Sequence, residues 1–139
     1  MVWLLAGHRK KTYELIVEKA NNSDTSFQHV HTYNLDEYVG LTGENPNSYR
    51  YYMNQLLFNK LKQLPIAQTH LPNGNAESLS HECRQYEKLI AEAGGIDVQL
   101  LGIGGNGHIG FNEPGTPFSS RTHVVQLDEE TRQANARFF

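Results

Sequence analysis

The sequence has little of what marks several other classes of protein. Its 139 residues contain one cysteine, Cys83, so no disulfide can form within the chain, which suits a cytoplasmic location. No apolar run approaches the ~18 residues that a membrane-spanning helix needs. Neither sign of charge dominates, since the formal net charge is −3. These features argue against a secreted disulfide scaffold, a membrane protein and a nucleic-acid-binding protein.

What is present is the composition of a folded domain, with 38% apolar and 19% charged residues. A chain of 139 residues is long enough for one hydrophobic core and too short for two comfortable domains. No internal repeat or low-complexity segment divides the sequence. We therefore treat residues 1–139 as a single domain.

Hydrophobic periodicity predicts helices interspersed with strands. The helices are expected over residues 10–20, about 49–61, about 78–93 and from 129 onward, and the strands over 30–35, 98–103 and 122–127. Ser78 or Ser80 is expected to cap the third helix. The run at 98–103 is continuously apolar, as expected of a strand covered on both faces. This order predicts an α/β fold of three layers, α/β/α, around a mainly parallel, Rossmann-like sheet.

The most informative segment is residues 104–114, Gly-Gly-Asn-Gly-His-Ile-Gly-Phe-Asn-Glu-Pro, which follows the apolar run. An amide (Asn106), an imidazole (His108) and a carboxyl group (Glu113) lie close together in it. Imidazole exchanges protons near neutral pH, and a carboxylate partner sets its tautomer and raises its basicity. A buried strand that ends in a glycine-rich, proton-handling loop is typical of α/β enzyme active sites.

Two other interpretations of this segment are weaker. Residues 102–107 match Gly-x-Gly-x-x-Gly, but Gly110 and Pro114 follow too closely for the helix that a dinucleotide-binding loop requires. The glycines more simply allow backbone amides to approach a sugar or phosphate. A metal site would need a third ligand, and no paired-histidine pattern supplies one.

Asp36 and Arg137 lie at positions where catalytic and phosphate-binding residues are common. Asp36 ends the expected strand at 30–35, beside Glu37 and Tyr38. Ligands bind at the carboxyl edge of open parallel sheets, and partial desolvation there raises the pKa of an aspartate, as suits a general base. The alternative is that the two adjacent acidic side chains are simply solvated. Arg137, beside two phenylalanines on the last helix, has a fork that matches phosphate oxygens, although a lone exposed arginine carries little information.

Together these motifs resemble a known family. Residues 34–41 (Asn-Leu-Asp-Glu-Tyr-Val-Gly-Leu), 101–115, 120–122 (Ser-Arg-Thr) and 134–139 are similar to glucosamine-6-phosphate deaminases, of the glucosamine/galactosamine-6-phosphate isomerase family. The resemblance covers about residues 12–139. Related 6-phosphogluconolactonases share the Gly-x-Gly-x-x-Gly-His element but diverge after it, where this sequence has Phe-Asn-Glu-Pro at 111–114.

The resemblance implies a reaction: glucosamine 6-phosphate and water give fructose 6-phosphate and ammonia, in amino-sugar catabolism, without cofactor or metal. By the same resemblance, His108 opens the pyranose ring and Glu113 orients and tunes it. Asp36 then moves a proton between C2 and C1. Some members have aspartate where this sequence has Asn106, which cannot relay charge but can fix the tautomer of His108 by hydrogen bonding.

The resemblance also implies how substrate and regulators bind. Arg137 matches an arginine that grips the substrate phosphate, and Gly102 matches a backbone contact to the substrate. Some members are activated by N-acetylglucosamine 6-phosphate through basic residues that correspond to His123 and Val125. Because a valine side chain cannot hold a phosphate, such activation is expected to be weak or absent.

The resemblance is to a longer domain. Residues 1–10 do not match the family's first strand and phosphate loop, and we hypothesise that they are frameshifted family sequence. The family also extends beyond the position that matches Phe139. The domain is therefore expected to be partial, with a sheet that lacks its first strand and apolar faces open to self-association.

Two alternative functions remain open from the sequence. One is an inactive fragment that only binds a sugar phosphate or associates with itself. The other is a hydrolase resembling 6-phosphogluconolactonase, against which the Phe-Asn-Glu-Pro sequence at 111–114 argues.

Overall fold

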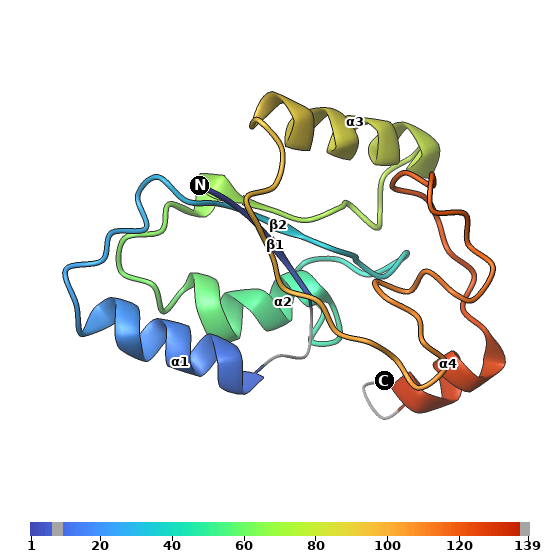
Figure 1. The fold of residues 1–139 in the computed structure, drawn as a ribbon, viewed down its shortest axis with the longest axis horizontal. Helices are drawn as coiled ribbons and strands as arrows, with labels where there is room; N and C mark the ends of the chain where they lie inside the picture. Colours follow the sequence, from blue (N-terminus) through green and yellow to red (C-terminus); the bar gives the residue numbers. More distant parts are fainter. Residues whose placement is uncertain (7–9, 137–139) are drawn as a thin grey trace.

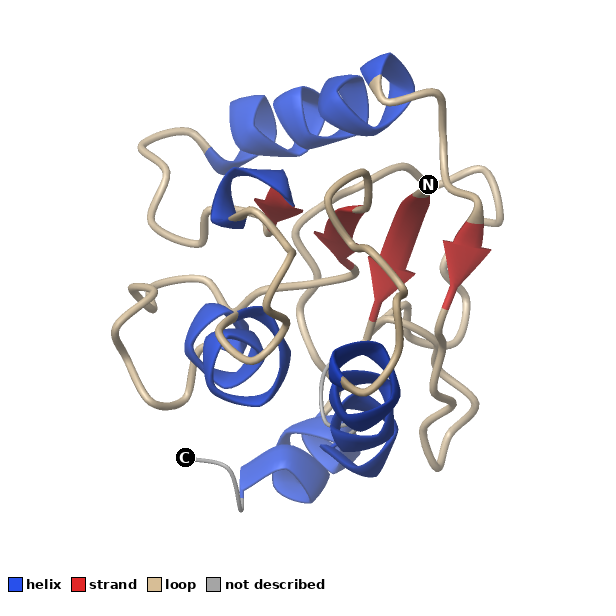
Figure 2. Ribbon diagram, turned by 90° about the vertical axis from the view of Figure 1, so that its left-hand side faces the viewer, coloured by secondary structure: helices blue, strands red, loops and turns tan. Residues whose placement is uncertain are grey.

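A computed structural model describes residues 1–6 and 10–136. Its sheet has four parallel strands in the order β3-β2-β1-β4. The strands are β1 (Val2–Leu5), β2 (His31–Asn34), β3 (Thr69–His70) and β4 (Val98–Gln99). In Figure 2 the arrow that begins at the N-terminus, which is β1, points the same way as the arrows on either side of it. The parallel, Rossmann-like α/β class is confirmed.

The position of β1 corrects one expectation. The sheet does not lack its first strand, because Val2–Leu5 forms β1 and pairs with β2 on one side and β4 on the other. Its sequence Val-Trp-Leu-Leu is the kind of apolar run that forms a buried strand. The mismatch of residues 1–10 with the family motif therefore did not prevent a strand from forming.

The helices cover both faces of the sheet. In Figure 1, α3 (Leu79–Glu92) lies on one face, and α1 (Lys10–Asn21) and α2 (Tyr49–Met53) lie on the other. The remaining helices are the π-helix η1 (Asn54–Phe58), the 3-10 helix η2 (Ile66–Gln68) and α4 (Glu129–Asn135). Ser78 caps α3, because its side chain accepts a hydrogen bond from the backbone N–H of His81 at 3.3 Å.

Two hydrophobic clusters hold these layers together. Side chains alternate along a strand, so neighbours in β1 face opposite sides of the sheet. Leu5 packs in a cluster with Tyr13 of α1 and Met53 of α2. Leu4 packs in a second cluster with Tyr86 of α3. The three-layer prediction is therefore confirmed.

The structure corrects three expected elements. The strand at 98–103 is reduced to Val98–Gln99, and Val98 is 49% exposed, so this edge strand is not covered on both faces. Within the described residues 122–127 there is no strand, because the backbone N–H of Thr122 donates to the side chain of Glu87 and not to a neighbouring strand. The helix at 49–61 widens into the π-helix η1 and ends at Phe58.

The fold brings the motif loops to one edge of the sheet. β2 leads into Asp36, and β4 leads into the glycine-rich segment after Leu100. The backbone N–H groups of Leu35 and Leu100 donate to the carbonyls of Leu5 and Leu4, respectively, each at 2.9 Å, so both loops leave the sheet beside β1. The carboxyl edge of this parallel sheet is where a ligand site is expected.

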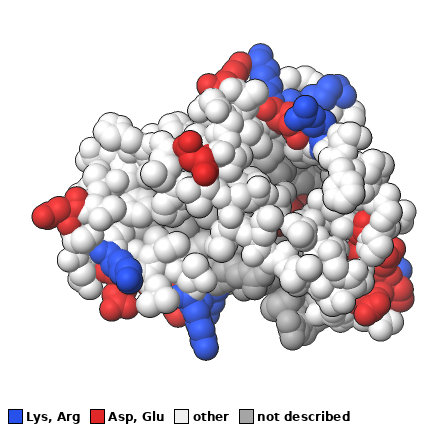
Figure 3. Space-filling model, viewed as in Figure 1, with Lys and Arg blue, Asp and Glu red and all other residues white. Residues whose placement is uncertain are grey.

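The surface shows no separation of charge on the face in Figure 3, where acidic and basic side chains are mixed. None of the described helices is long and apolar enough to cross a membrane.

Candidate active site

A cavity of about 140 Å³ lies at the carboxyl edge of the sheet. Three of the predicted site residues, Asp36, Gly102 and His108, line it together. Asp36 comes from the end of β2 and the other two from the loop after β4, so the sheet joins segments that are far apart in the sequence. Asn106 and Glu113 lie behind His108, as the hydrogen bonds below show.

A chain of hydrogen bonds joins His108, Asn106 and Glu113. Nδ1 of His108 lies 2.7 Å from Oδ1 of Asn106. The same Oδ1 accepts from the backbone N–H of His108 at 3.2 Å. On its other side, Nδ2 of Asn106 donates to Oε2 of Glu113 at 2.7 Å. Oε2 of Glu113 is also 3.8 Å from Nδ1 of His108.

This chain fixes the position of a proton. An ionised carboxylate only accepts hydrogen bonds, so the side of Asn106 that faces Glu113 is its NH₂ group. The amide oxygen therefore faces His108, and Nδ1 of His108 is the donor in that contact. In the neutral imidazole, Nε2 then carries the lone pair. A histidine held in this tautomer is arranged to act as a base through Nε2.

Glu113 is held as an anion. Its residue is 9% exposed, and burial acts to raise the pKa of its carboxyl group. Hydrogen bonds from Thr131, Asn106 and the backbone N–H of Asp128, together with the nearby His108, outweigh this effect and lower the pKa of Glu113 overall. Thr131 and Asp128 belong to α4 and its N-cap, so this short helix secures the far end of the hydrogen-bonded chain.

The loop that carries His108 depends on glycine and on one unusual backbone angle. A Cβ atom at Gly104 would lie 2.1 Å from Cε1 of His108, so only glycine leaves room for the imidazole. Phe111 has φ = 57°, in the left-handed region that a bulky residue seldom adopts. Its ring lies 5.5 Å from the ring of His108 and 6.2 Å from that of Tyr38.

Asp36 differs from Glu113 because no hydrogen bond from a described residue offsets the burial of its Oδ1 atom. Burial, and to a smaller extent the charge of Glu37, raises the pKa of Asp36 from 3.8 to about 7. Its Oδ1 is buried and has no hydrogen-bond partner among the described residues. A carboxyl group in this state can take up and release a proton near neutral pH, which is what a general base requires.

Glu37 holds the backbone next to Asp36 in position. Its carboxylate accepts hydrogen bonds from the backbone N–H groups of Tyr38, Tyr49 and Arg50 at 2.8, 3.0 and 2.9 Å. It therefore ties the loop after β2 to the first turn of α2, next to the Ser48 cap. This contact fixes the backbone that carries Asp36.

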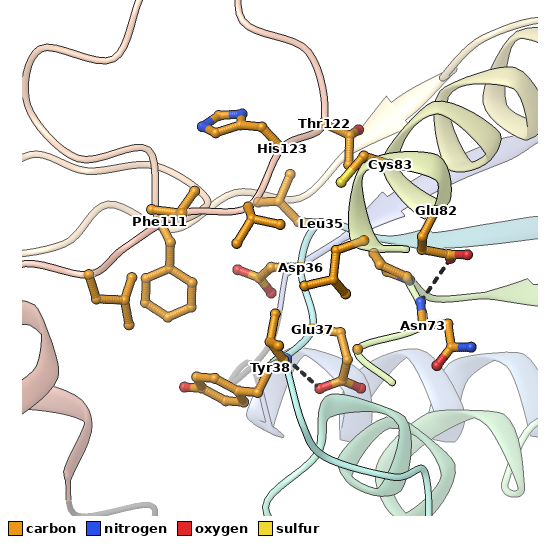
Figure 4. A pocket seen from close by; sticks show the side chains of 17 residues that line it. Leu35, Asp36, Glu37, Tyr38, Asn73, Glu82, Cys83, Phe111, Thr122 and His123 are labelled. Atoms are coloured by element: carbon orange, nitrogen blue, oxygen red, sulfur yellow. Dashed lines mark hydrogen bonds between the residues drawn. The ribbon is translucent and has the colours of Figure 1, made fainter. Parts of the chain in front are cut away.

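A second cavity, of about 190 Å³, adjoins the first (Figure 4). Leu35, Asp36 and Phe111 line both cavities, whereas His108 lines only the first. Cys83 and Thr122 also border the second cavity, as Figure 4 shows. His123 and Val125, which correspond to regulatory positions in some family members, line it too.

The structure gives no position for one of the predicted site residues. Arg137 lies outside the described residues. No three His, Cys, Asp or Glu side chains are grouped to hold a metal ion within residues 1–6 and 10–136.

Sequence reasoning missed several residues that build the site. Gly104 was assigned only a general role, although its place in the glycine motif beside His108 was a usable signal. Tyr49 lines the first cavity, although its place in the apolar spacing of the helix expected at 49–61 indicates only a core residue. No pattern in the sequence pointed to Thr131. Glu37 was visible as the neighbour of Asp36, but its contacts with the first turn of α2 were not, because they join distant segments.

Comparison with known proteins agrees with this geometry. A family model described as glucosamine-6-phosphate isomerases/6-phosphogluconolactonase matches residues 7–137. The glucosamine-6-phosphate deaminase of Shouchella clausii is 64% identical over 133 residues, which are 96% of this chain and 53% of that protein. Glucosamine-6-phosphate deaminase 1 of Bacillus subtilis is 53% identical over 96% of this chain and 54% of its own length. The chain thus spans about half the length of these curated relatives.

Solved structures give the same result. A monomeric glucosamine-6-phosphate deaminase superposes with a TM-score of 0.95 at 51% identity, covering 99% of this chain and 58% of the other. A 6-phosphogluconolactonase from Thermotoga maritima superposes with a TM-score of 0.65 at 23% identity, covering 78% of this chain and 48% of the other, and this likeness shows the fold alone. The chain belongs to the glucosamine-6-phosphate isomerase/6-phosphogluconolactonase family.

Proposed function

We propose that this chain carries the reaction centre of a glucosamine-6-phosphate deaminase, which converts glucosamine 6-phosphate and water to fructose 6-phosphate and ammonia. The observation that carries the proposal is the hydrogen-bonded chain of His108, Asn106 and Glu113 on the same cavity as Asp36. Two proton-handling groups in different environments are thus available to one substrate, as an isomerisation through proton transfer requires.

In the proposed first step, Nε2 of His108 takes the proton of the sugar's anomeric hydroxyl group and delivers it to the ring oxygen as the bond between that oxygen and C1 breaks. The pyranose ring thereby opens to the free aldehyde. Asn106 keeps the other imidazole nitrogen protonated, and the anionic Glu113 stabilises the positive charge that His108 gains. A carboxylate near an imidazole favours the protonated ring electrostatically. Asn106 thus transmits orientation, and Glu113 supplies the charge.

In the proposed second step, Asp36 removes the proton from C2 and delivers it to C1 through an enediol-like intermediate. Its raised pKa suits both halves of this transfer, because an acid with a pKa of about 7 is neither too weak a base nor too weak an acid at neutral pH. Water then replaces nitrogen at C2, and ammonia leaves.

The names of the relatives support this reaction over the alternatives. Glucosamine-6-phosphate deaminase is the printed name of the curated relatives above, at 64% and 53% identity. No described feature favours lactone hydrolysis, and Phe111 and Glu113 of the sequence at 111–114 both contact or support His108.

Ammonia release from glucosamine 6-phosphate tests the proposal, with the intact Shouchella clausii deaminase as positive control. The 139-residue chain is expected to turn over. The His108→Gln and Asp36→Asn variants are expected to lose at least a hundredfold, because each removes a proton acceptor. His29→Gln, at an exposed histidine outside the cavity, is the matched control.

Two results would contradict the proposal. An inactive chain beside an active relative would show that this chain is at most a sugar-phosphate-binding fragment. Hydrolysis of 6-phosphogluconolactone without ammonia release would assign it to the lactonase chemistry instead.

We also propose roles for the remaining predicted contacts. Arg137 would hold the substrate phosphate, so Arg137→Met is expected to raise the KM for glucosamine 6-phosphate more than it lowers kcat. N-acetylglucosamine 6-phosphate would activate weakly or not at all, because His123 and Val125 line a cavity without a lysine or arginine among its described lining residues. Rate curves with and without that sugar would then superpose.

Self-association through open apolar surface is a further proposal. Val98 at the edge strand β4 is 49% exposed, and Ile103 in the following loop is 73% exposed. Sedimentation velocity over a concentration series is expected to show association, and Ile103→Lys is expected to weaken it.

A further inference from the structure

The turn at residues 109–112 carries a side chain that its backbone does not favour. The backbone N–H of Asn112 donates to the carbonyl of Ile109 at 3.1 Å, and these two residues form an isolated antiparallel bridge. Both central residues have positive φ, 59° at Gly110 and 57° at Phe111, as in type I′ turns. Glycine, asparagine and aspartate are the usual residues there, because a Cβ atom is strained in this region. Strained positions of this kind cluster at functional sites, where surrounding contacts hold them.

The turn lies directly against the segment that carries Asp36. A Cβ atom at Gly110 would lie 2.7 Å from Cδ2 of Leu35, so the turn backbone contacts the residue before Asp36. The ring of Phe111 lies 6.2 Å from the ring of Tyr38, two residues after Asp36. Figure 4 shows the side chains of Phe111 and Asp36 pointing into the same space from different segments. The strained turn thus brings a phenylalanine to the loop after β2.

The same ring also contacts the imidazole of His108. The centroids of the Phe111 and His108 rings are 5.5 Å apart, and their planes are tilted by 33°. Asn106 holds one nitrogen of the imidazole by a hydrogen bond, and Gly104 lies so close that a Cβ atom there would be 2.1 Å from Cε1. The Phe111 ring adds a contact with the body of the imidazole, which limits how far the ring can tilt about the hydrogen-bonded nitrogen.

Phe111 separates the two cavities beside Asp36. Leu35, Asp36 and Phe111 line both of them. Oδ1 of Asp36 is buried, and no described residue donates a hydrogen bond to it. Loss of the Phe111 ring would open this common wall and let water approach the carboxyl group. Burial is the main cause of the raised pKa of Asp36, so the wall preserves the protonation behaviour that the proposed function needs.

We propose that Phe111 is a positioning residue for both proton-handling groups: its ring fixes the imidazole of His108 and excludes water from the carboxyl group of Asp36. The inference rests on the proposed function for its effect on the reaction, but not for these two effects on the side chains. The left-handed backbone at Phe111 is what places one aromatic ring where the loops after β2 and β4 meet.

Three variants separate the ring from the turn. Phe111→Gly removes the ring and is expected to keep the turn, because glycine is favoured at this position. Phe111→Tyr keeps the ring. Phe118→Gly is the matched control, because it removes a fully exposed phenylalanine from the same part of the chain. Far-UV circular dichroism checks that each variant folds.

Two NMR measurements follow the side chains without turnover. The three-bond couplings of His108 Cγ to its backbone nitrogen and carbonyl carbon distinguish a single χ1 rotamer from an average, and Phe111→Gly is expected to give averaged values. The pKa of Asp36, followed by its carboxyl ¹³C resonance, is expected to fall from about 7 toward 3.8 in Phe111→Gly. The resonance is assigned by its loss in Asp36→Asn. Phe111→Tyr and Phe118→Gly are expected to match the parent in both measurements.

Ammonia release from glucosamine 6-phosphate measures the effect on the reaction. In Phe111→Gly, kcat is expected to fall about tenfold or more with KM unchanged, because a misplaced base affects the chemical step and not substrate binding. Phe111→Tyr is expected to restore the kcat of the parent, and Phe118→Gly to leave it unchanged.

Each measurement can overturn the proposal. Unchanged His108 couplings in Phe111→Gly would remove the role toward the imidazole, and an unchanged titration of Asp36 would remove the role toward its carboxyl group. A fall in kcat that Phe111→Tyr does not restore would show that the ring is not the cause. A parent chain that releases no ammonia would refute the proposed function alone, since the two NMR measurements would still decide this inference.

Discussion

Replacing Asp36 with asparagine should make the protein more stable above neutral pH, by an amount that the structure sets. The pKa of Asp36 is about 7 in the folded chain against an ordinary value of 3.8, chiefly because of burial. Each pH unit is worth about 1.4 kcal/mol, so ionised Asp36 costs the folded state on the order of 4 kcal/mol. An asparagine side chain is not ionised at any pH, so Asp36→Asn removes this cost while keeping the side chain's shape.

The sign of the pH dependence follows from proton counting. Between pH 3.8 and about 7 the folded state binds more protons at Asp36 than the unfolded state, so its free energy of unfolding falls as pH rises through this window. Above the window the loss is complete. The difference in unfolding free energy between Asp36→Asn and the parent is therefore expected to be smallest near pH 4 and to reach its maximum above pH 7.

Urea unfolding followed by circular dichroism, from pH 4 to 8, measures this difference. Asp24→Asn, at an exposed aspartate, is the matched control and is expected to show almost none of it. A difference between Asp36→Asn and the parent that stays constant across the pH range would refute the reasoning, because the carboxyl group would then not be ionising in a buried site. The confirmed result would identify Asp36 as a group whose burial destabilises the fold, which is common at catalytic positions.

Three other predictions concern the surroundings of His108 and the segment after it. Asn106→Leu should lower the unfolding free energy by about 2–3 kcal/mol, since it removes one of the hydrogen bonds that the buried Glu113 carboxylate accepts. It should also mix the two tautomers of His108 in ¹⁵N NMR spectra, and a single unchanged tautomer would contradict this prediction. Gly104→Ala should displace the imidazole of His108, because the new Cβ atom would lie 2.1 Å from it. The free energy of unfolding, measured by thermal unfolding, should fall by about 1–3 kcal/mol. Gly105→Ala is the control, because its Cβ atom would have nothing within 4 Å. The pKa of Glu87 is lowered mainly by the hydrogen bond from the side chain of Thr122, so the stabilising contribution of ionised Glu87 is lost as pH falls through that lowered pKa. Glu87→Gln should therefore flatten the acid side of the curve of unfolding free energy against pH. An unchanged acid side of that curve would contradict the prediction.

The geometry around His108 gives the asparagine at position 106 a physical interpretation. Its two amide ends complement an acceptor-only carboxylate and a donor nitrogen, so it transmits the orientation of Glu113 to the imidazole without carrying charge. An aspartate at this position would place two carboxylates in contact at Oε2 of Glu113, and one of them would have to hold a proton. Asn106 avoids that proton and leaves Glu113 as the sole anion of the chain of hydrogen bonds.

The sequence by itself determined the local elements and the residue types of the site. Residues 10–20 and 78–93 formed helices as their periodicity indicates, since apolar spacing and a serine cap act within a few residues. The cluster of Asn106, His108 and Glu113 was visible for the same reason, because its members lie within one loop.

Only the tertiary structure decided how these pieces meet. Val2–Leu5 became a central strand because β2 and β4 bond to it on either side, and residues 122–127 formed no strand because Thr122 bonds to Glu87 instead. The order β3-β2-β1-β4 brings Asp36 to the cavity of His108, and α4 brings Thr131 to Glu113. Such contacts depend on strand order and on the partners available in space, which local periodicity does not encode.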